Sequence, residues 1–162
     1  MTGKKRFEVP RILEILREGP EAIWDATHDL SSDELRARPA PDEWSAHEIL
    51  AHLRACADVW GGCIETMLSQ DHPTITGVNP RRWILSSDLP KKEFHASLRE
   101  FAEQRRRLMS MLEPLGPDGW NRSATIRGAG KPLTKTVLDY ADRLARHERP
   151  HIRQIRTATI RG

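Results

Sequence analysis

Residues 43–53 read EWSAHEILAHL and contain the clearest helix start in the chain. Ser45 and Glu48 stand three positions apart, which is the spacing of a capping box. In that motif each side chain binds a backbone N–H of the first helical turn. Trp44 precedes the cap, so its ring can pack against Ile49 as a hydrophobic staple. The stretch predicts that a helix begins at Ser45.

Apolar residues recur at the helical period in four long segments, and none of these segments shows the two-residue alternation of a strand. The segments cover about residues 11–30, 45–69, 91–115 and 134–157. Four amphipathic helices, with no strands and no fixed repeat, predict an all-α fold, a four-helix bundle. Within the first segment, Gly19 and Pro20 are expected to bend the helix or divide it in two.

Long connections follow the second and third predicted helices. Residues 70–87 and 118–132 are rich in glycine and proline, so we expect both to be irregular loops. The sequence Gly116-Pro117-Asp118-Gly119 is expected to end the third helix. Loops of this length leave room for crossovers between helices, and inside a compact domain they are more often functional or mobile than idle. A shorter connection opens with a capped turn at residues 31–35.

The length of 162 residues favours one domain over residues 1–162. A formal net charge of +3 is too weakly basic to require nucleic acid as a partner. No apolar stretch approaches the roughly 18 residues of a membrane-spanning helix. The basic start, residues 1–8, is followed by no apolar segment, so we expect no secretory signal and a cytoplasmic protein.

Cys56 and Cys63 are the two cysteines of the chain. Seven helical residues separate their Cα atoms by about 10.5 Å, and a disulfide needs about 7 Å or less, so the two cannot pair. Both lie on the apolar stripe of the second helix. Cys56 is a candidate thiolate ligand or redox site, against the plainer interpretation of a small buried apolar side chain.

The histidines divide by the helix face on which they lie. His52 falls inside the apolar stripe of the second helix when residues are placed at 100° intervals, whereas His47 falls on the side expected to face water. His147 and His151 share the inward side of the last helix. Opposite them lie four arginines, Arg146, Arg149, Arg153 and Arg156. Three further histidines lie on separate segments without a companion: His28, His72 and His95.

Two histidines at positions i and i+4 on one helix face can bind the same divalent ion. Chance alone gives roughly 0.3 such pairs in a chain of this composition, so the pair by itself is a weak motif. A single inward histidine is most often a hydrogen-bonded core residue. Three inward imidazoles on two helices would each need a separate buried partner, whereas one metal ion satisfies all three. The spacing of the histidines alone leaves both interpretations open, a set of hydrogen-bonded core residues and a metal site.

Three stretches together resemble the DinB-like superfamily. They are EWS at 43–45, EILAHL at 48–53 and HERPHIRQI at 147–155, and the resemblance covers about residues 10–156. That group includes metal-dependent hydrolases and transferases that depend on the thiols bacillithiol or mycothiol, and many of its members are dimers. The resemblance therefore implies a homodimeric four-helix bundle.

The same resemblance implies that His52, His147 and His151 form a three-histidine site for a divalent metal. In this chain Pro150 lies inside the ligand pair. Proline lacks an N–H and crowds the preceding turn, so a kink could shift His151 relative to His147. Three imidazoles do not discriminate among nickel, zinc, iron and manganese.

Two classes of function follow from the predicted site. The first is a metal-dependent enzyme acting on a small-molecule substrate, either as a hydrolase or as an S-transferase that uses a low-molecular-weight thiol. Three protein ligands leave positions open for water or substrate, as in catalytic sites. The second class is a non-catalytic, stress-associated bundle with a binding or structural role.

Several residues near the predicted site allow more than one role. Glu48 fits the capping box better than a position beside the metal. Glu148 falls at the edge of the inward stripe, where an exposed charge is the commoner arrangement, although a carboxylate there could orient a ligand histidine. Trp60 shares the face of His52 and could line a pocket. The arginine run at residues 105–107 is expected to be a solvated helix face.

Overall fold

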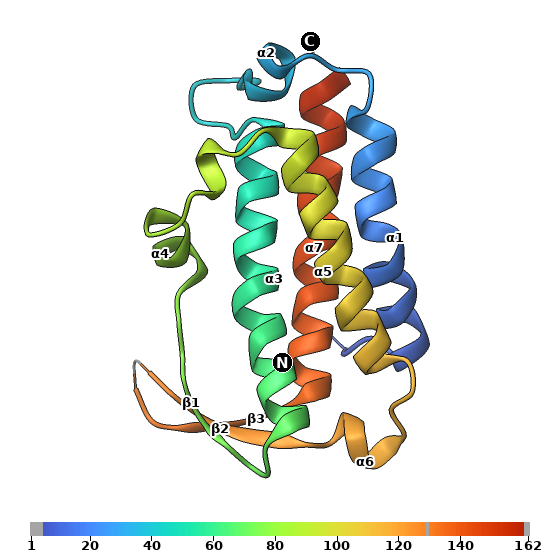
Figure 1. Ribbon diagram of the computed structural model, residues 1–162, viewed down its shortest axis with the longest axis vertical. Helices are drawn as coiled ribbons and strands as arrows, with labels where there is room; N and C mark the ends of the chain where they lie inside the picture. Colours follow the sequence, from blue (N-terminus) through green and yellow to red (C-terminus); the bar gives the residue numbers. More distant parts are fainter. Residues whose placement is uncertain (1–4, 129, 161–162) are drawn as a thin grey trace.

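The computed structural model describes residues 5–128 and 130–160, and its architecture is a bundle of four long helices (Figure 1). They are α1 (Val9–Thr27), α3 (Ala46–Ser69), α5 (Phe94–Leu112) and α7 (Val137–Ile160). Helix α3 packs on α7, α7 on α1, α1 on α5 and α5 on α3, which closes the ring. The predicted four-helix bundle is confirmed. Among the described residues no helix is long and apolar enough to cross a membrane.

Two apolar clusters fill the bundle, and each long helix contributes to both. Four fully buried residues, one from each helix, mark the first cluster: Leu16, Ile64, Leu112 and Leu144. Four others mark the second cluster: Ile23, Leu50, Phe101 and Ile155. Each such side chain stabilises the fold by roughly 1.5–3 kcal/mol through burial. Where the two clusters meet lie five polar side chains, which we call the polar layer: His52, Arg105, His147, Glu148 and His151.

Local signals explain the helix boundaries that the sequence predicted well. The capping box of Ser45 and Glu48 forms as expected at the start of α3, which ends at Ser69. A second capping box, between Ser31 and Glu34, starts the short helix α2 (Ser32–Arg36). Helix α1 runs through Pro20 as one helix, so the chain is not divided into two helices there.

The expectation that the chain forms no strands is wrong. Three short strands, β1 (Thr74–Thr76), β2 (Ser123–Arg127) and β3 (Leu133–Thr136), form one sheet in the order β1-β2-β3. Strand β1 pairs with β2 in parallel, and β2 pairs with β3 antiparallel. In β2, SATIR, polar and apolar residues do alternate, so the sequence held a signal for this strand that the prediction missed. The sheet lies across one end of the bundle, away from α2 (Figure 1).

The connections predicted as irregular loops also contain short helices. Helix α4 (Pro80–Leu85) starts at an Asn79 cap and lies beside α3, and the 3-10 helix η1 (Leu89–Lys91) follows it. Helix α5 ends at Leu112, before the predicted end, and the four residues predicted to stop it instead begin α6 (Pro117–Trp120). The predicted absence of a secretory signal rests partly on residues 1–4, which lie outside the described residues.

Candidate metal centre

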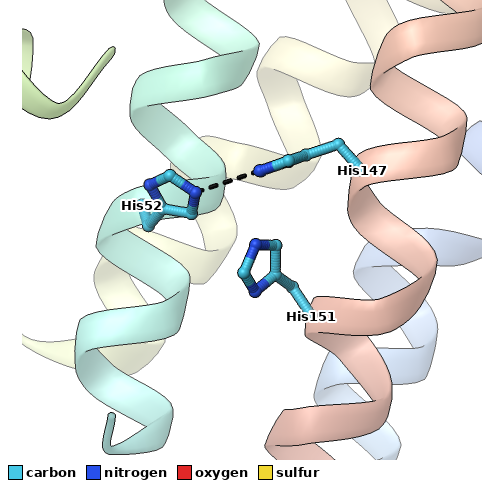
Figure 2. Close-up of side chains that lie close together, drawn as sticks. All are labelled: His52, His147 and His151. Carbon is cyan, nitrogen blue, oxygen red and sulfur yellow. Dashed lines mark hydrogen bonds between the residues drawn. The ribbon is translucent and has the colours of Figure 1, made fainter.

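Three imidazoles from two helices converge in the polar layer (Figure 2). His52 points from α3 toward α7, and His147 and His151 point from α7 toward α3. One ligand atom from each ring can be chosen so that all three lie within 4.8 Å of one another. The Nε2 atoms of His52 and His147 are 3.0 Å apart. The structure thus brings together the three histidines that the helical wheels selected.

Pro150 does not separate the two histidines of α7. The helix is continuous from Val137 to Ile160, and the ring centroids of His147 and His151 are 4.5 Å apart. Because residues four apart project from adjacent turns of the same face, both rings still reach toward α3. Pro150 therefore does not prevent the two imidazoles from joining the same cluster.

The surroundings keep two of these rings neutral. Burial, with smaller contributions from the nearby His151 and Arg81, lowers the pKa of His52 to about 4. The pKa of His147 is also lowered to about 4, first by burial and then by His151, His52 and Arg143. A neutral imidazole keeps a lone pair on one nitrogen, and that lone pair is what a metal ligand requires. At neutral pH both rings are ready to bind a cation.

The hydrogen bonding of the two buried rings is incomplete. His52 and His147 bind each other through Nε2, and neither Nδ1 atom has a partner although both are buried. A buried polar group without a hydrogen bond costs roughly 1–3 kcal/mol. Two nitrogens held 2.0–2.1 Å from one ion lie roughly 2.9–3.3 Å apart at octahedral or tetrahedral angles. The 3.0 Å separation falls within that range, so the donor set fits a divalent ion.

His151 is oriented by a residue that the sequence analysis did not select. Its Nδ1–H donates to Oε1 of Gln154 at 2.7 Å. That bond leaves Nε2 of His151 as the nitrogen with a free lone pair. Metal-binding histidines usually donate their other N–H to such an acceptor. The signal available in the sequence was an amide three residues after the histidine, on the same helix.

Two tryptophans enclose the imidazoles. Trp44 lies edge-on to His52, with ring centroids 5.1 Å apart, and stacks on His151 at 6.2 Å. Trp60 lies edge-on to His147 at 5.1 Å. Trp60 therefore contacts the cluster through His147, and Trp44 packs against the imidazoles as well as preceding the helix cap.

A cleft of about 630 Å³ opens beside the cluster. His151 and Trp44 form part of its wall, together with Ile49, Arg81 and Gln154. Pockets for small molecules usually measure about 300–1,000 Å³. The cleft gives a ligand of that size access to the edge of the histidine cluster.

One histidine prediction is wrong. His47 does not face water, because only 7% of the residue is exposed and its Nε2 lies 2.8 Å from the carbonyl oxygen of Pro90. The 3-10 helix η1 packs against α3 there and covers the ring. A helical wheel describes one helix and contains no information about a connection that folds back over it.

The predictions for Glu148 and Arg105 are also wrong. Glu148 is 1% exposed and Arg105 is 3% exposed, and the two form a buried ion pair between α7 and α5. Both side chains belong to the polar layer, on the side of α7 that faces α1 and α5. Glu48, in contrast, closes the capping box as predicted and also binds Arg38. No carboxylate among the described residues joins the histidine cluster.

This chain matches a known protein family and resembles a solved structure. The family model of the DinB superfamily matches residues 15–155. YfiT from Bacillus subtilis, described as a probable metal-dependent hydrolase with an unusual four-helix bundle topology, has a similar structure, with a TM-score of 0.79. The two sequences are 16% identical, and the match covers 99% of this chain and 91% of that chain. At this identity the likeness shows the fold. No curated protein matches the sequence.

Proposed function

Because this chain belongs to the DinB superfamily, we propose that it is a metal-dependent hydrolase that acts on a small molecule. His52, His147 and His151 would hold a divalent ion. The observation that carries the proposal is the convergence of three imidazole nitrogens within 4.8 Å inside the bundle. When bound, the ion supplies Lewis-acid chemistry, polarising a carbonyl group and activating water.

The residues around the cluster support this proposal by orienting the ligands and packing against them. Gln154 holds His151 in the tautomer that leaves Nε2 free. Trp44 and Trp60 pack edge-on against the rings of His52 and His147. Fixed ligand orientation is part of what the protein contributes in metal-ion catalysis.

The finer expectations from the sequence and from the family resemblance remain proposals. They are the identity of the metal, a thiol co-substrate with S-transferase activity, a homodimer, a single domain with its core at about residues 10–156, and a cytoplasmic location. Conjugation of an electrophile, measured with and without candidate thiols, separates the transferase from the hydrolase. Hydrolysis of esters or amides with no dependence on any thiol would exclude the transferase.

Metal analysis of protein purified without a histidine tag tests the centre itself. We expect about one equivalent of a divalent metal, and its loss in the double variant His52→Ala/His147→Ala. The matched control His28→Ala/His95→Ala removes two imidazoles outside the cluster and should retain the metal. A protein that takes up no metal, and whose stability does not respond to added Zn²⁺ or Ni²⁺, would favour the non-catalytic, stress-associated bundle instead.

A further inference from the structure

A thiol lies next to the histidine cluster. Cys56 follows His52 by one turn of α3 and is 1% exposed. Its Sγ atom is 3.8 Å from Nε2 of His52 and 3.9 Å from Nε2 of His147. The sulfur therefore lies almost equally far from the two nitrogens, which are themselves 3.0 Å apart.

These three distances define a triangle of the size that a metal ion requires. For sides of 3.0, 3.8 and 3.9 Å, the point equidistant from the three atoms lies about 2.1 Å from each of them. Zinc binds imidazole nitrogen at about 2.0–2.1 Å and thiolate sulfur at about 2.3 Å. One ion could therefore be held by Nε2 of His52, Nε2 of His147 and Sγ of Cys56 together. His151 completes the set with a ligand atom within 4.8 Å of the other two imidazoles.

We propose that Cys56 is a fourth protein ligand, so that the centre is a His₃Cys site. The inference rests on the proposed metal centre and specifies its chemistry: with four protein ligands, the water or substrate of the proposed hydrolase would take a fifth position, to which zinc sites can expand. A thiolate is a soft ligand that favours zinc, whereas three imidazoles alone discriminate weakly among the divalent metals. The site accordingly selects Zn²⁺, and its close substitute Co²⁺, over Mn²⁺.

Binding of the ion requires the thiol to lose its proton. Burial raises the pKa of Cys56 to about 12, so without a metal the thiol is neutral at pH 7. On coordination the S–H bond breaks, the proton passes to solvent, and a sulfur lone pair forms the bond to the ion. Sulfur is neither oxidised nor reduced in this step.

The second cysteine provides a matched control. Cys63 lies on the same helix, is also buried, and hydrogen-bonds with Tyr140. Its replacement by serine makes the same chemical change in the same core cluster, away from the imidazoles. Any effect that Cys56→Ser has and Cys63→Ser lacks therefore belongs to the position next to His52 and His147.

Substitution with Co²⁺ tests the ligand directly. The wild type and Cys63→Ser should show a sulfur-to-cobalt charge-transfer band in the near ultraviolet, and Cys56→Ser should lose that band while keeping the visible ligand-field bands of bound Co²⁺. Bound Co²⁺ without the band in the wild type would overturn the proposal and leave a three-histidine site. A wild type that binds no Co²⁺ at all would instead refute the metal centre, and with it the proposed function.

Metal selectivity gives a second measurement that does not depend on activity. The ratio of the Mn²⁺ and Zn²⁺ dissociation constants should fall by about tenfold or more in Cys56→Ser, and it should not change in Cys63→Ser. An unchanged ratio in Cys56→Ser would overturn the proposal. If serine prevents folding, as judged by circular dichroism, Cys56→Ala makes the same comparison with an apolar side chain.

Discussion

The polar layer contains two clusters that begin at adjacent residues of α7 and differ in burial and in hydrogen bonding: the Arg105–Glu148 pair is buried, whereas only His52 of the three histidines is. Glu148 faces α1 and α5, where both of its oxygens bind the guanidinium of Arg105. Arg105 also donates to the carbonyl oxygen of Leu16 at 2.7 Å. His147 faces α3, where its one polar partner among the described residues is His52, apart from the nearby thiol of Cys56.

The difference indicates separate purposes for the two clusters. The ion pair is satisfied by the protein alone and needs no ligand, so its purpose is to hold three helices in register. The histidine cluster holds two uncharged rings whose Nε2 atoms lie 3.0 Å apart, and one divalent ion could bind both nitrogens in place of the hydrogen bond between them. Titratable side chains that converge beside a cleft and have strongly shifted pKa values mark a place where a ligand is expected.

The largest effect is expected from breaking the buried ion pair between Arg105 and Glu148. Glu148→Ala leaves Arg105 charged and buried without its partner, and we expect a loss of about 3–5 kcal/mol in the free energy of unfolding. Denaturation by urea measures it. The double variant Arg105→Met/Glu148→Leu replaces both charges by apolar groups and should recover most of the loss. A loss below about 1 kcal/mol in Glu148→Ala would show that the pair does not hold the helices.

The next largest effect is expected from acidification, which acts on the histidine cluster. In metal-free protein, the pKa of His52 and His147 is lowered to about 4 in the folded state, against about 6.5 in the unfolded chain. The unfolded state therefore binds more protons, and stability falls as the pH drops from about 6.5 toward 4. Urea denaturation at several pH values measures this slope. His52→Gln/His147→Gln should flatten it, and a slope unchanged by that double variant would contradict the prediction.

Substitution of Gly19 tests how closely α1 packs against the ion pair of Arg105 and Glu148. A Cβ atom at Gly19 would lie 3.1 Å from Oε2 of Glu148, whose position is fixed by Arg105. Gly19→Ala should therefore destabilise the fold by about 1–2 kcal/mol, despite the better helix propensity of alanine. The matched control is Gly61→Ala on α3, where the Cβ meets nothing within 4 Å and a gain of up to about 1 kcal/mol is expected. Equal effects of the two changes would contradict this account.

The smallest effect concerns the orientation of one ligand. Gln154→Ala removes the acceptor of the His151 Nδ1–H and should weaken Zn²⁺ binding about tenfold while leaving the fold intact. Isothermal titration with Zn²⁺ measures it. Gln154→Glu keeps an acceptor and should bind at least as tightly as the wild type. Equal affinity in the alanine variant would mean that the ring is oriented by its contact with Trp44.

Prediction from the sequence succeeded where the cause is local. The capping box at Ser45 and Glu48 uses groups three residues apart, and the helical period places His52, His147 and His151 inward whatever the other helices do. It failed where the cause is a contact between distant segments. Strand β1 pairs with β2 about fifty residues later, and η1 covers His47 from more than forty residues away.

The sequence by itself determined that this chain forms four amphipathic helices and that three imidazoles lie on their inward faces, because the helical period and the caps act over a few residues. Only the tertiary structure decided which inward polar groups meet. It paired Glu148 with Arg105 across 43 positions, and it brought Nε2 of His147 to 3.0 Å from His52. The physical reason is that a buried polar atom needs a partner, and helix packing fixes which partner lies within reach.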